Sequence, residues 1–505
     1  MTPIRSILIA NRGEIALRII RTCRELGVRS IAVYSDADRA SRYVRAADEA
    51  LHLGPSPPAS SYLNGQAIID CALKANADAI HPGYGFLSES AMFAGMVRAA
   101  GLTFVGPTPE TIALLGDKTE ARRLMKQQGI PVLPGTDGTF STSEEAARAA
   151  ATFGFPVILK AAAGGGGRGM RVVRDAGSFE QAFQAASSEA SSAFGDGRIF
   201  FERYFEQSRH VEFQIMGDSM GNVVHLGERE CSIQRRHQKI LEESPSPALT
   251  AGLRDAMGIC ALRAARCTRY CGAGTVEFLL DESGNFYFLE VNTRLQVEHP
   301  VTELRTGLDL VAMQITIAQG QPLPFDQSQI QWRGHAIECR ICAEDIDRQF
   351  APAAGRITHW RPSQGPGIRE DSGVEEESEI SVFYDSLLSK LCVWAPTRGE
   401  AIQRMKRALE EYEIMGVPTN LALLRRIVED PIFQSGTYST TFLTQRASAL
   451  VQGDDRTAEE EAAAIVCALL EDASKHPANG TRPQREVQTG TNPPQSRWKN
   501  RGSWK

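Results

Sequence analysis

The first 115 residues alternate short β-branched runs with amphipathic helical stretches. The runs lie at residues 7–10, 31–34, 79–81 and 103–105, and residues 14–26 form the clearest helical stretch. Strands separated by helices are typical of βαβ units, which fold into a parallel sheet. A dinucleotide fingerprint needs three glycines in the first turn, where this chain has only Gly13, so the pattern predicts the fold without that cofactor.

Three further regions follow this segment. Residues 131–203 predict a compact α/β lid, with strands near 156–160 and 170–173 and a helix near 178–194. Residues 210–298 show apolar alternation interrupted by one helix around 253–270, which indicates a mostly antiparallel sheet. Another mixed region runs from about 333 to 446.

The character of the chain changes after residue 445. Thr457 and Glu460 form a capping box ahead of an Ala-rich helix, and a Pro-, Gly-, Asn- and Thr-rich stretch follows. We expect the last thirty or so residues to be disordered or to serve as a docking segment. The chain is therefore predicted to be an α/β and α+β multidomain protein with four segments: 1–115, 116–332 (lid about 131–203), 333–446 and 447–505.

Charge and composition exclude several classes of protein. Lys and Arg number 55 against 61 Asp and Glu, so no global basic field favours nucleic acid, and small-molecule chemistry is expected. The ten cysteines are scattered, and Cys339 and Cys342 form a lone Cys-x-x-Cys that we interpret as strand residues. Scattered cysteines without a disulfide pattern are typical of a protein in a reducing cytoplasm. A signal peptide and a membrane span are not expected, because no apolar run is long enough.

A glycine-rich loop, residues 163–169, lies between two predicted strands. Consecutive glycines let backbone N–H groups approach phosphate oxygens without side-chain collision. Lys160 on the preceding strand and Lys118 could supply positive charge to the same polyphosphate. We therefore expect phosphate contact here, against the alternative of a flexible surface hairpin.

The strongest constellation is a predicted hairpin over residues 275–292. A turn centred at Ser283–Gly284 makes Glu277 and Glu290 direct cross-strand partners. Two facing carboxylates repel unless a cation lies between them. Oxygen ligands of this kind, with Asn292 on the same face, suit Mg²⁺ or Mn²⁺ bridging to phosphates, whereas an exposed acidic hairpin is the alternative.

The same period-two spacing continues through Arg294, Gln296 and Glu298. An extended strand would align these side chains into an anion pocket that contains a general base. A second polar cluster, residues 228–239, gathers basic groups near a predicted strand end. Nucleic-acid binding is disfavoured there, because the cluster lacks interleaved aromatic residues.

Five motifs in fixed order resemble the biotin carboxylases, which are ATP-grasp enzymes. These motifs occupy residues 11–16, 81–89, 164–170, 231–239 and 290–300, and the resemblance covers about residues 4 to 446. It implies a Rossmann-like N-terminal domain, an ATP-grasp domain with a mobile lid, and a C-terminal domain that completes the site.

The resemblance also implies site residues. The ATP-binding set is Lys118, Lys160, Gly165, Gly166, Gly167, Glu202, His210, Gln234, His237, Glu277 and Glu290. The Mg²⁺ or Mn²⁺ ligands are Glu277, Glu290 and Asn292. The bicarbonate set is Lys239, Arg294, Gln296, Val297 and Glu298, with Glu298 as the base. Arg340 stabilises the biotin enolate.

The implied reaction activates bicarbonate with ATP to carboxyphosphate and then carboxylates biotin. No Met-Lys-Met attachment motif occurs, so biotin is expected on a separate biotin carboxyl carrier protein, with a carboxyltransferase as a further subunit. Acetyl-CoA carboxylase is the first expectation, and the biotin carboxylase subunit of pyruvate carboxylase is the second. The alternatives are a carbamoyl-phosphate-type ATP-grasp ligase and a non-catalytic subunit.

The family resemblance further implies a homodimer. Arg21, Glu25 and Arg369 match residues through which family members pair. Pro366, however, stands where a Phe is expected, so the sequence departs from the family at this interface.

Overall fold

The computed structural model describes residues 3–162, 170–236, 238–451 and 466. The chain divides into two units, residues 1–453 and 454–505, and only residue 466 of the second is described. The glycine-rich loop, His237 and the helix predicted after Thr457 therefore lie outside the described residues. Among the helices that are described, none combines the length and the apolar character that a membrane crossing requires.

The N-terminal segment forms the predicted parallel sheet, in the order β3-β2-β1-β4-β5. Its strands are β1 (Ser6–Ile9), β2 (Arg29–Ser35), β3 (Glu49–Gly54), β4 (Ala79–His81) and β5 (Thr103–Phe104). Its helices are α1 (Gly13–Glu25), α2 (Arg42–Ala46), α3 (Gly65–Lys74), α4 (Ala91–Ala99) and α5 (Pro109–Gly116). Strand β3 was not predicted, because it is an edge strand whose residues are mostly only half-buried and which lacks a continuous β-branched run.

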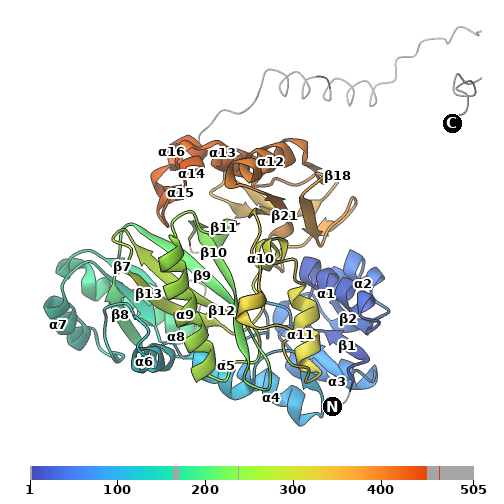
Figure 1. Cartoon of the computed structure of the whole chain (residues 1–505), viewed down its shortest axis with the longest axis horizontal. Helices are drawn as coiled ribbons and strands as arrows, with labels where there is room; N and C mark the ends of the chain where they lie inside the picture. The colour runs from blue at the N-terminus through green and yellow to red at the C-terminus, as the bar shows by residue number, and fades with distance from the viewer. Residues whose placement is uncertain (1–2, 163–169, 237, 452–465, 467–505) are drawn as a thin grey trace, which may run out of the picture. The chain divides into compact units, whose positions relative to one another are not determined.

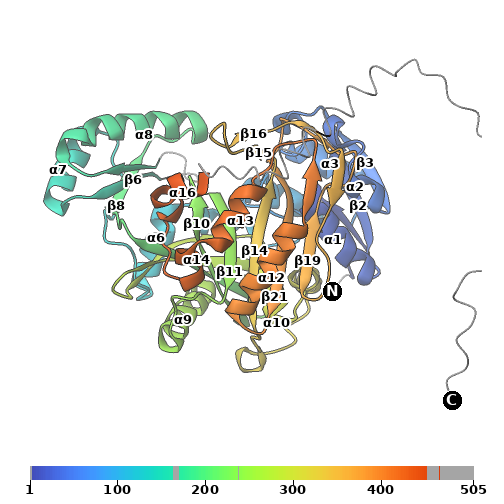
Figure 2. The ribbon, with the colours of Figure 1, turned by 90° about the horizontal axis from the view of Figure 1, so that it is seen from above.

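The lid is a small α/β layer. Its sheet, ordered β7-β6-β8, contains β6 (Val157–Ala161), β7 (Arg171–Val173) and β8 (Ile199–Arg203). Two helices, α7 (Ser143–Phe153) and α8 (Phe179–Phe194), pack on it around buried Leu159, Phe179 and Phe201. Helix α6 (Lys118–Gln127) leads into the lid. In Figures 1 and 2 the lid and the N-terminal sheet lie on opposite sides of the central strands.

An eight-stranded antiparallel sheet forms the centre, in the order β13-β12-β9-β10-β11-β14-β21-β19. Its strands are β9 (Ser208–Gly217), β10 (Val223–Arg235), β11 (Gln238–Ser244), β12 (Gly272–Asp281), β13 (Phe286–Asn292), β14 (His335–Cys342), β19 (Ile368–Ser372) and β21 (Leu387–Ala395). The antiparallel prediction for residues 210–298 is confirmed, and the interrupting helix is α9 (Ala251–Cys267). Cys339 and Cys342 are strand residues as predicted.

Alternation along β9 explains the position of the site. Val211, Phe213 and Ile215 join the apolar core that α9 covers. The intervening residues, Glu212 among them, point to the opposite face because side chains alternate along a strand. One face of the sheet is thus a conventional core, and the other carries buried polar groups.

The remaining elements complete the sheet on its C-terminal side. Two helices, α10 (His299–Thr306) and α11 (Leu310–Ala318), follow β13. The C-terminal helices are α12 (Arg398–Glu411), α13 (Leu421–Glu429), α14 (Pro431–Ser435), α15 (Phe442–Gln445) and α16 (Ala447–Val451). Short strand pairs join β15 (Glu344–Asp345) to β16 (Ala351–Pro352), β17 (Gly355–Arg356) to β20 (Glu379–Ile380), and β18 (His359–Arg361) to β22 (Glu413–Met415). Because β14, β21 and β19 extend the same sheet, the predicted segment 333–446 adds strands beside the polar face.

Candidate active site

The acidic hairpin has the predicted pairing. Glu277 of β12 and Glu290 of β13 are cross-strand partners, and a register shift follows Glu277. The amide of Asn292 donates to Glu277 Oε1 at 2.8 Å. Two carboxylates and an amide on neighbouring strand positions are a hard oxygen-rich donor set that fits Mg²⁺.

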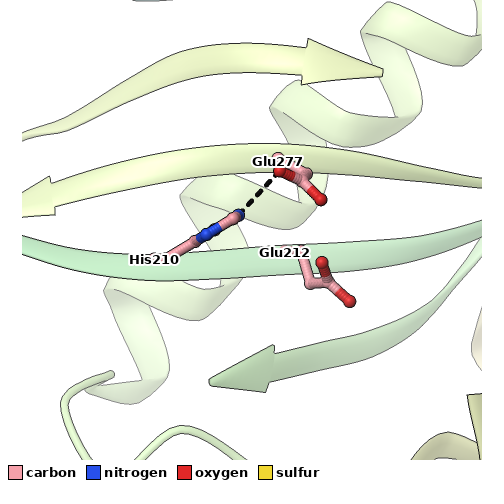
Figure 3. A group of neighbouring side chains, drawn as sticks. All are labelled: His210, Glu212 and Glu277. Atoms are coloured by element: carbon pink, nitrogen blue, oxygen red, sulfur yellow. Dashed lines mark ion pairs between the residues drawn. The ribbon is translucent and has the colours of Figure 1, made fainter. Parts of the chain in front are cut away.

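Basic side chains of the chain itself also compensate the charge of these two acids. Lys239 Nζ lies 3.2 Å from Glu277, and Lys118 Nζ lies 2.8 Å from Glu290. His210 Nε2 adds a contact of 2.7 Å to Glu277 (Figure 3). The positive charge that two facing carboxylates require is therefore supplied in part by the chain itself, because long basic side chains from other elements reach the acids.

These cations determine the ionisation of the pair. Burial opposes the charge on Glu277, but Lys239 and His210 outweigh it and hold the pKa of Glu277 well below its ordinary value. Lys118 lowers the pKa of Glu290 against the opposing effect of burial. Both groups are thus carboxylates at neutral pH, the form that a metal or a lysine requires.

Lys239 is the centre of the polar cluster. Its Nζ contacts Glu212 at 2.6 Å and Glu298 at 2.6 Å in addition to Glu277. A lysine ammonium has three donors, so all three are used. Burial lowers the pKa of Lys239, but the three acids raise it well above its ordinary value, which keeps the ammonium charged.

Glu298 is fully buried immediately before α10. One carboxylate oxygen accepts from Lys239, and the other accepts from the Arg340 guanidinium at 2.8 Å. Burial disfavours the charge, yet Lys239, Arg340 and Arg229 hold the pKa of Glu298 well below its ordinary value. The group is therefore a fully buried carboxylate that is ionised at neutral pH.

The segment between β13 and α10 differs from the prediction. The strand ends at Asn292, so Arg294, Gln296 and Glu298 do not continue its period-two face. The bent segment still brings them together: Arg294 donates to Gln296 Oε1 at 2.9 Å and to Asn292 Oδ1 at 3.2 Å. Arg294 Nε also donates to Glu89 at 2.9 Å, and Glu89 accepts the backbone N–H of Thr293 at 3.1 Å.

The nucleotide-side residues are partly described. Lys160 Nζ contacts Glu202 at 2.5 Å on neighbouring lid strands, and the Gln234 amide lies 2.7 Å from His210 Nδ1. Gly165, Gly166, Gly167 and His237 lie outside the described residues. The structure thus brings Lys118, His210 and Gln234 to the sheet and Lys160 and Glu202 to the lid.

Sequence reasoning missed several members of the cluster. Buried Arg229 donates to Glu212 at 2.5 Å, and Arg340 Nε donates to buried Glu242 at 2.6 Å. The available signal was polar residues alternating with apolar ones, as Glu212 does between Val211 and Phe213.

Arg369, one of the residues expected at a dimer interface, has partners within the chain. Arg369 donates to Glu303 at 2.7 Å and to Asp371 at 2.7 Å. Its charge is therefore already paired in the single chain.

Among the nine cysteines that the structure describes, none forms a disulfide.

Comparison with known families identifies all three regions. The biotin carboxylase N-terminal domain matches residues 3–112, and the biotin carboxylase C-terminal domain matches residues 338–445. The ATP binding domain of the carbamoyl-phosphate synthase L chain matches residues 117–326.

Individual relatives agree with these matches. A biotin carboxylase of Nostoc sp. is 55% identical over 439 residues, which is 87% of this chain and 98% of the relative. A pyruvate carboxylase subunit of Methanothermobacter thermautotrophicus is 52% identical, over 87% of this chain and 89% of the relative.

A solved structure shows the same fold. The biotin carboxylase domain dimer of Hydrogenobacter thermophilus 2-oxoglutarate carboxylase, in complex with MgADP, ADP and bicarbonate, has a TM-score of 0.87 and 46% identity. The match covers 89% of this chain and 99% of that one. The chain therefore belongs to the biotin carboxylase family and is an ATP-grasp ligase with the biotin carboxylase activity of a biotin-dependent carboxylase.

Proposed function

We propose that Glu298 is the general base for bicarbonate, and that the chain uses ATP to carboxylate biotin on a separate carrier protein. The observation that carries the proposal is the buried Glu298 carboxylate, held ionised between Lys239 and Arg340. A proton acceptor must be ionised and within reach of its substrate. Lys239 and Arg340 lower the pKa of Glu298. A bound anion that draws either cation away from Glu298 would raise this pKa and make the carboxylate a stronger base.

Bicarbonate would be held beside this base. The Arg294 guanidinium offers planar donors suited to an oxyanion, and Gln296 and the Val297 backbone lie on the same segment. Lys239 adds a positive charge that neutralises the deprotonated substrate. Support comes from the Hydrogenobacter thermophilus structure, which contains bicarbonate.

ATP would lie between lid and sheet. Its contacts would be Lys118, Lys160, Gly165, Gly166, Gly167, Glu202, His210, Gln234 and His237. Glu277, Glu290 and Asn292 would hold Mg²⁺, which neutralises phosphate oxygens when bound. The lysines supply the remaining positive charge at the transferring phosphoryl group, and a closed lid excludes water that would hydrolyse carboxyphosphate.

Biotin and the partner proteins complete the assembly. Arg340 would stabilise the biotin enolate, since its guanidinium already lies beside Glu298. The carrier and the carboxyltransferase would be separate chains in the cytoplasm, with acetyl-CoA as the first expected acceptor and pyruvate as the second. Homodimerisation is supported by the dimer in the Hydrogenobacter thermophilus structure.

The ATP binding domain over residues 117–326 is described for the carbamoyl-phosphate synthase L chain, so the test must separate the proposed reaction from that of a carbamoyl-phosphate-type ligase. Measurement of ADP release with each substrate omitted in turn separates the two. We expect release that requires bicarbonate and rises with free biotin. Release that requires ammonia and ignores biotin would support the ligase, and no release under any condition would indicate a non-catalytic role.

A further inference from the structure

Lys390 lies beside the segment that carries Glu298. It belongs to β21, is fully buried, and is the cross-strand partner of Arg340 on β14. Directly opposite residues on antiparallel strands share one face of the sheet. The two basic side chains therefore project together toward the start of α10.

The Lys390 ammonium contacts the backbone of this segment. Its Nζ donates to the carbonyl oxygen of Val297 at 2.9 Å. Val297 lies after the end of β13 and before α10, so no strand ladder fixes its carbonyl. Arg340 thus holds the side chain of Glu298, and Lys390 holds the peptide immediately before it.

The N-terminal part of the chain anchors Lys390 in turn. Glu14 Oε1, on the first turn of α1, lies 3.1 Å from Lys390 Nζ, and the Tyr84 hydroxyl donates to the same carboxylate. A lysine has three donors and can serve Glu14 and Val297 together. A buried ion pair adds little net stability to a fold. The pair of Glu14 and Lys390 is therefore better explained by the position that it gives to the Lys390 ammonium.

Glu14 and Tyr84 each belong to one of the family motifs, and the proposed ATP, metal, bicarbonate and biotin contacts leave these two residues without a role. Glu14 lies in the motif at residues 11–16, and Tyr84 lies in the motif at residues 81–89. Both motifs converge on a single ammonium behind the candidate base.

We propose that Lys390, anchored by Glu14, is a positioning residue that fixes the peptide between Gln296 and Glu298 and so sets the base against bicarbonate. The proposal rests on the proposed role of Glu298. It predicts a defect confined to bicarbonate use, since Lys390 contacts none of the residues assigned to ATP in the described part of the chain.

The test is the double variant Glu14→Gln/Lys390→Met, which replaces the buried pair with neutral side chains of similar size. We expect kcat/KM for bicarbonate to fall about 100-fold, the scale of an ångström-sized misplacement of a reacting group. The dissociation constant for MgADP, measured by calorimetry, should stay within about twofold of the unmodified chain. Glu14→Gln alone keeps the ammonium on Val297 and should cost less than about fivefold.

Two results would overturn the proposal: an unchanged kcat/KM for bicarbonate, or an equal loss of MgADP affinity, which marks a general structural defect. If the double variant does not fold, Lys390→Gln undergoes the same comparison. Failure of that variant to fold would also overturn the positioning role. Full activity of Glu298→Gln would instead refute the proposed function, so the two failures are distinguishable.

Discussion

Glu298→Gln should lower kcat for bicarbonate-dependent ADP release about 1,000-fold, the scale of losing a general base. The amide has nearly the same shape but accepts no proton. Lys239 keeps Glu212 and Glu277 as partners, and Arg340 keeps Glu242, so neither cation is left unpaired. MgADP affinity, measured by calorimetry, should therefore remain.

Glu282→Gln is the matched control for this substitution. Glu282 is exposed on the turn between β12 and β13, and it contacts none of the acids or bases of the site. Its kcat should equal that of the unmodified chain. Full activity of Glu298→Gln would show that another group deprotonates bicarbonate.

Arg229→Met should lower the melting temperature by roughly 4 °C, because losing one partner of a buried ion pair costs about 3–5 kcal/mol and the unfolding entropy of a unit this large is about 1 kcal/mol per degree. The guanidinium is completely buried, and besides Glu212 it donates to Gln214 at 2.7 Å, Thr302 at 3.0 Å and Thr275 at 3.0 Å. Methionine fills similar space but leaves these acceptors without a donor. Thermal unfolding followed by circular dichroism measures the shift.

Arg174→Met provides the comparison for Arg229→Met. Arg174 is 64% exposed and pairs with Glu206, which is 62% exposed. Exposed ion pairs contribute about 0–1 kcal/mol, so the melting temperature of this variant should move by no more than about 1 °C. An equal shift in the two variants would show that the buried network contributes no more than a surface pair.

In the acidic hairpin, the pairing of the two acids could be predicted from the sequence, but the bulge between the strands could not. A turn centred between Ser283 and Gly284 correctly predicts that Glu277 faces Glu290. Near the turn, however, the register is shifted by one residue: Leu280 faces Phe286, and Phe278 faces Phe288. This register by itself would place Leu289 opposite Glu277. A bulge restores the pairing of the acids, and an extra residue of this kind has no local sequence signal here.

The site beyond the hairpin depends on contacts distant in sequence. Motifs and spacing identified Lys239, Arg340 and Glu298 as one set only through the family resemblance. Their meeting requires β11 and β14 to be neighbours in the sheet, which local patterns do not specify. The end of β13 at Asn292 was equally unpredictable, because apolar and polar residues continue to alternate beyond it.

A crystal structure with Mg²⁺, a non-hydrolysable ATP analogue and bicarbonate tests the central claim most directly. The account predicts Mg²⁺ bound by Glu277 and Glu290, and bicarbonate on Arg294 within about 3 Å of the Glu298 carboxylate. Bicarbonate bound out of reach of Glu298, or a nucleotide-bound metal that contacts neither acid, would contradict it.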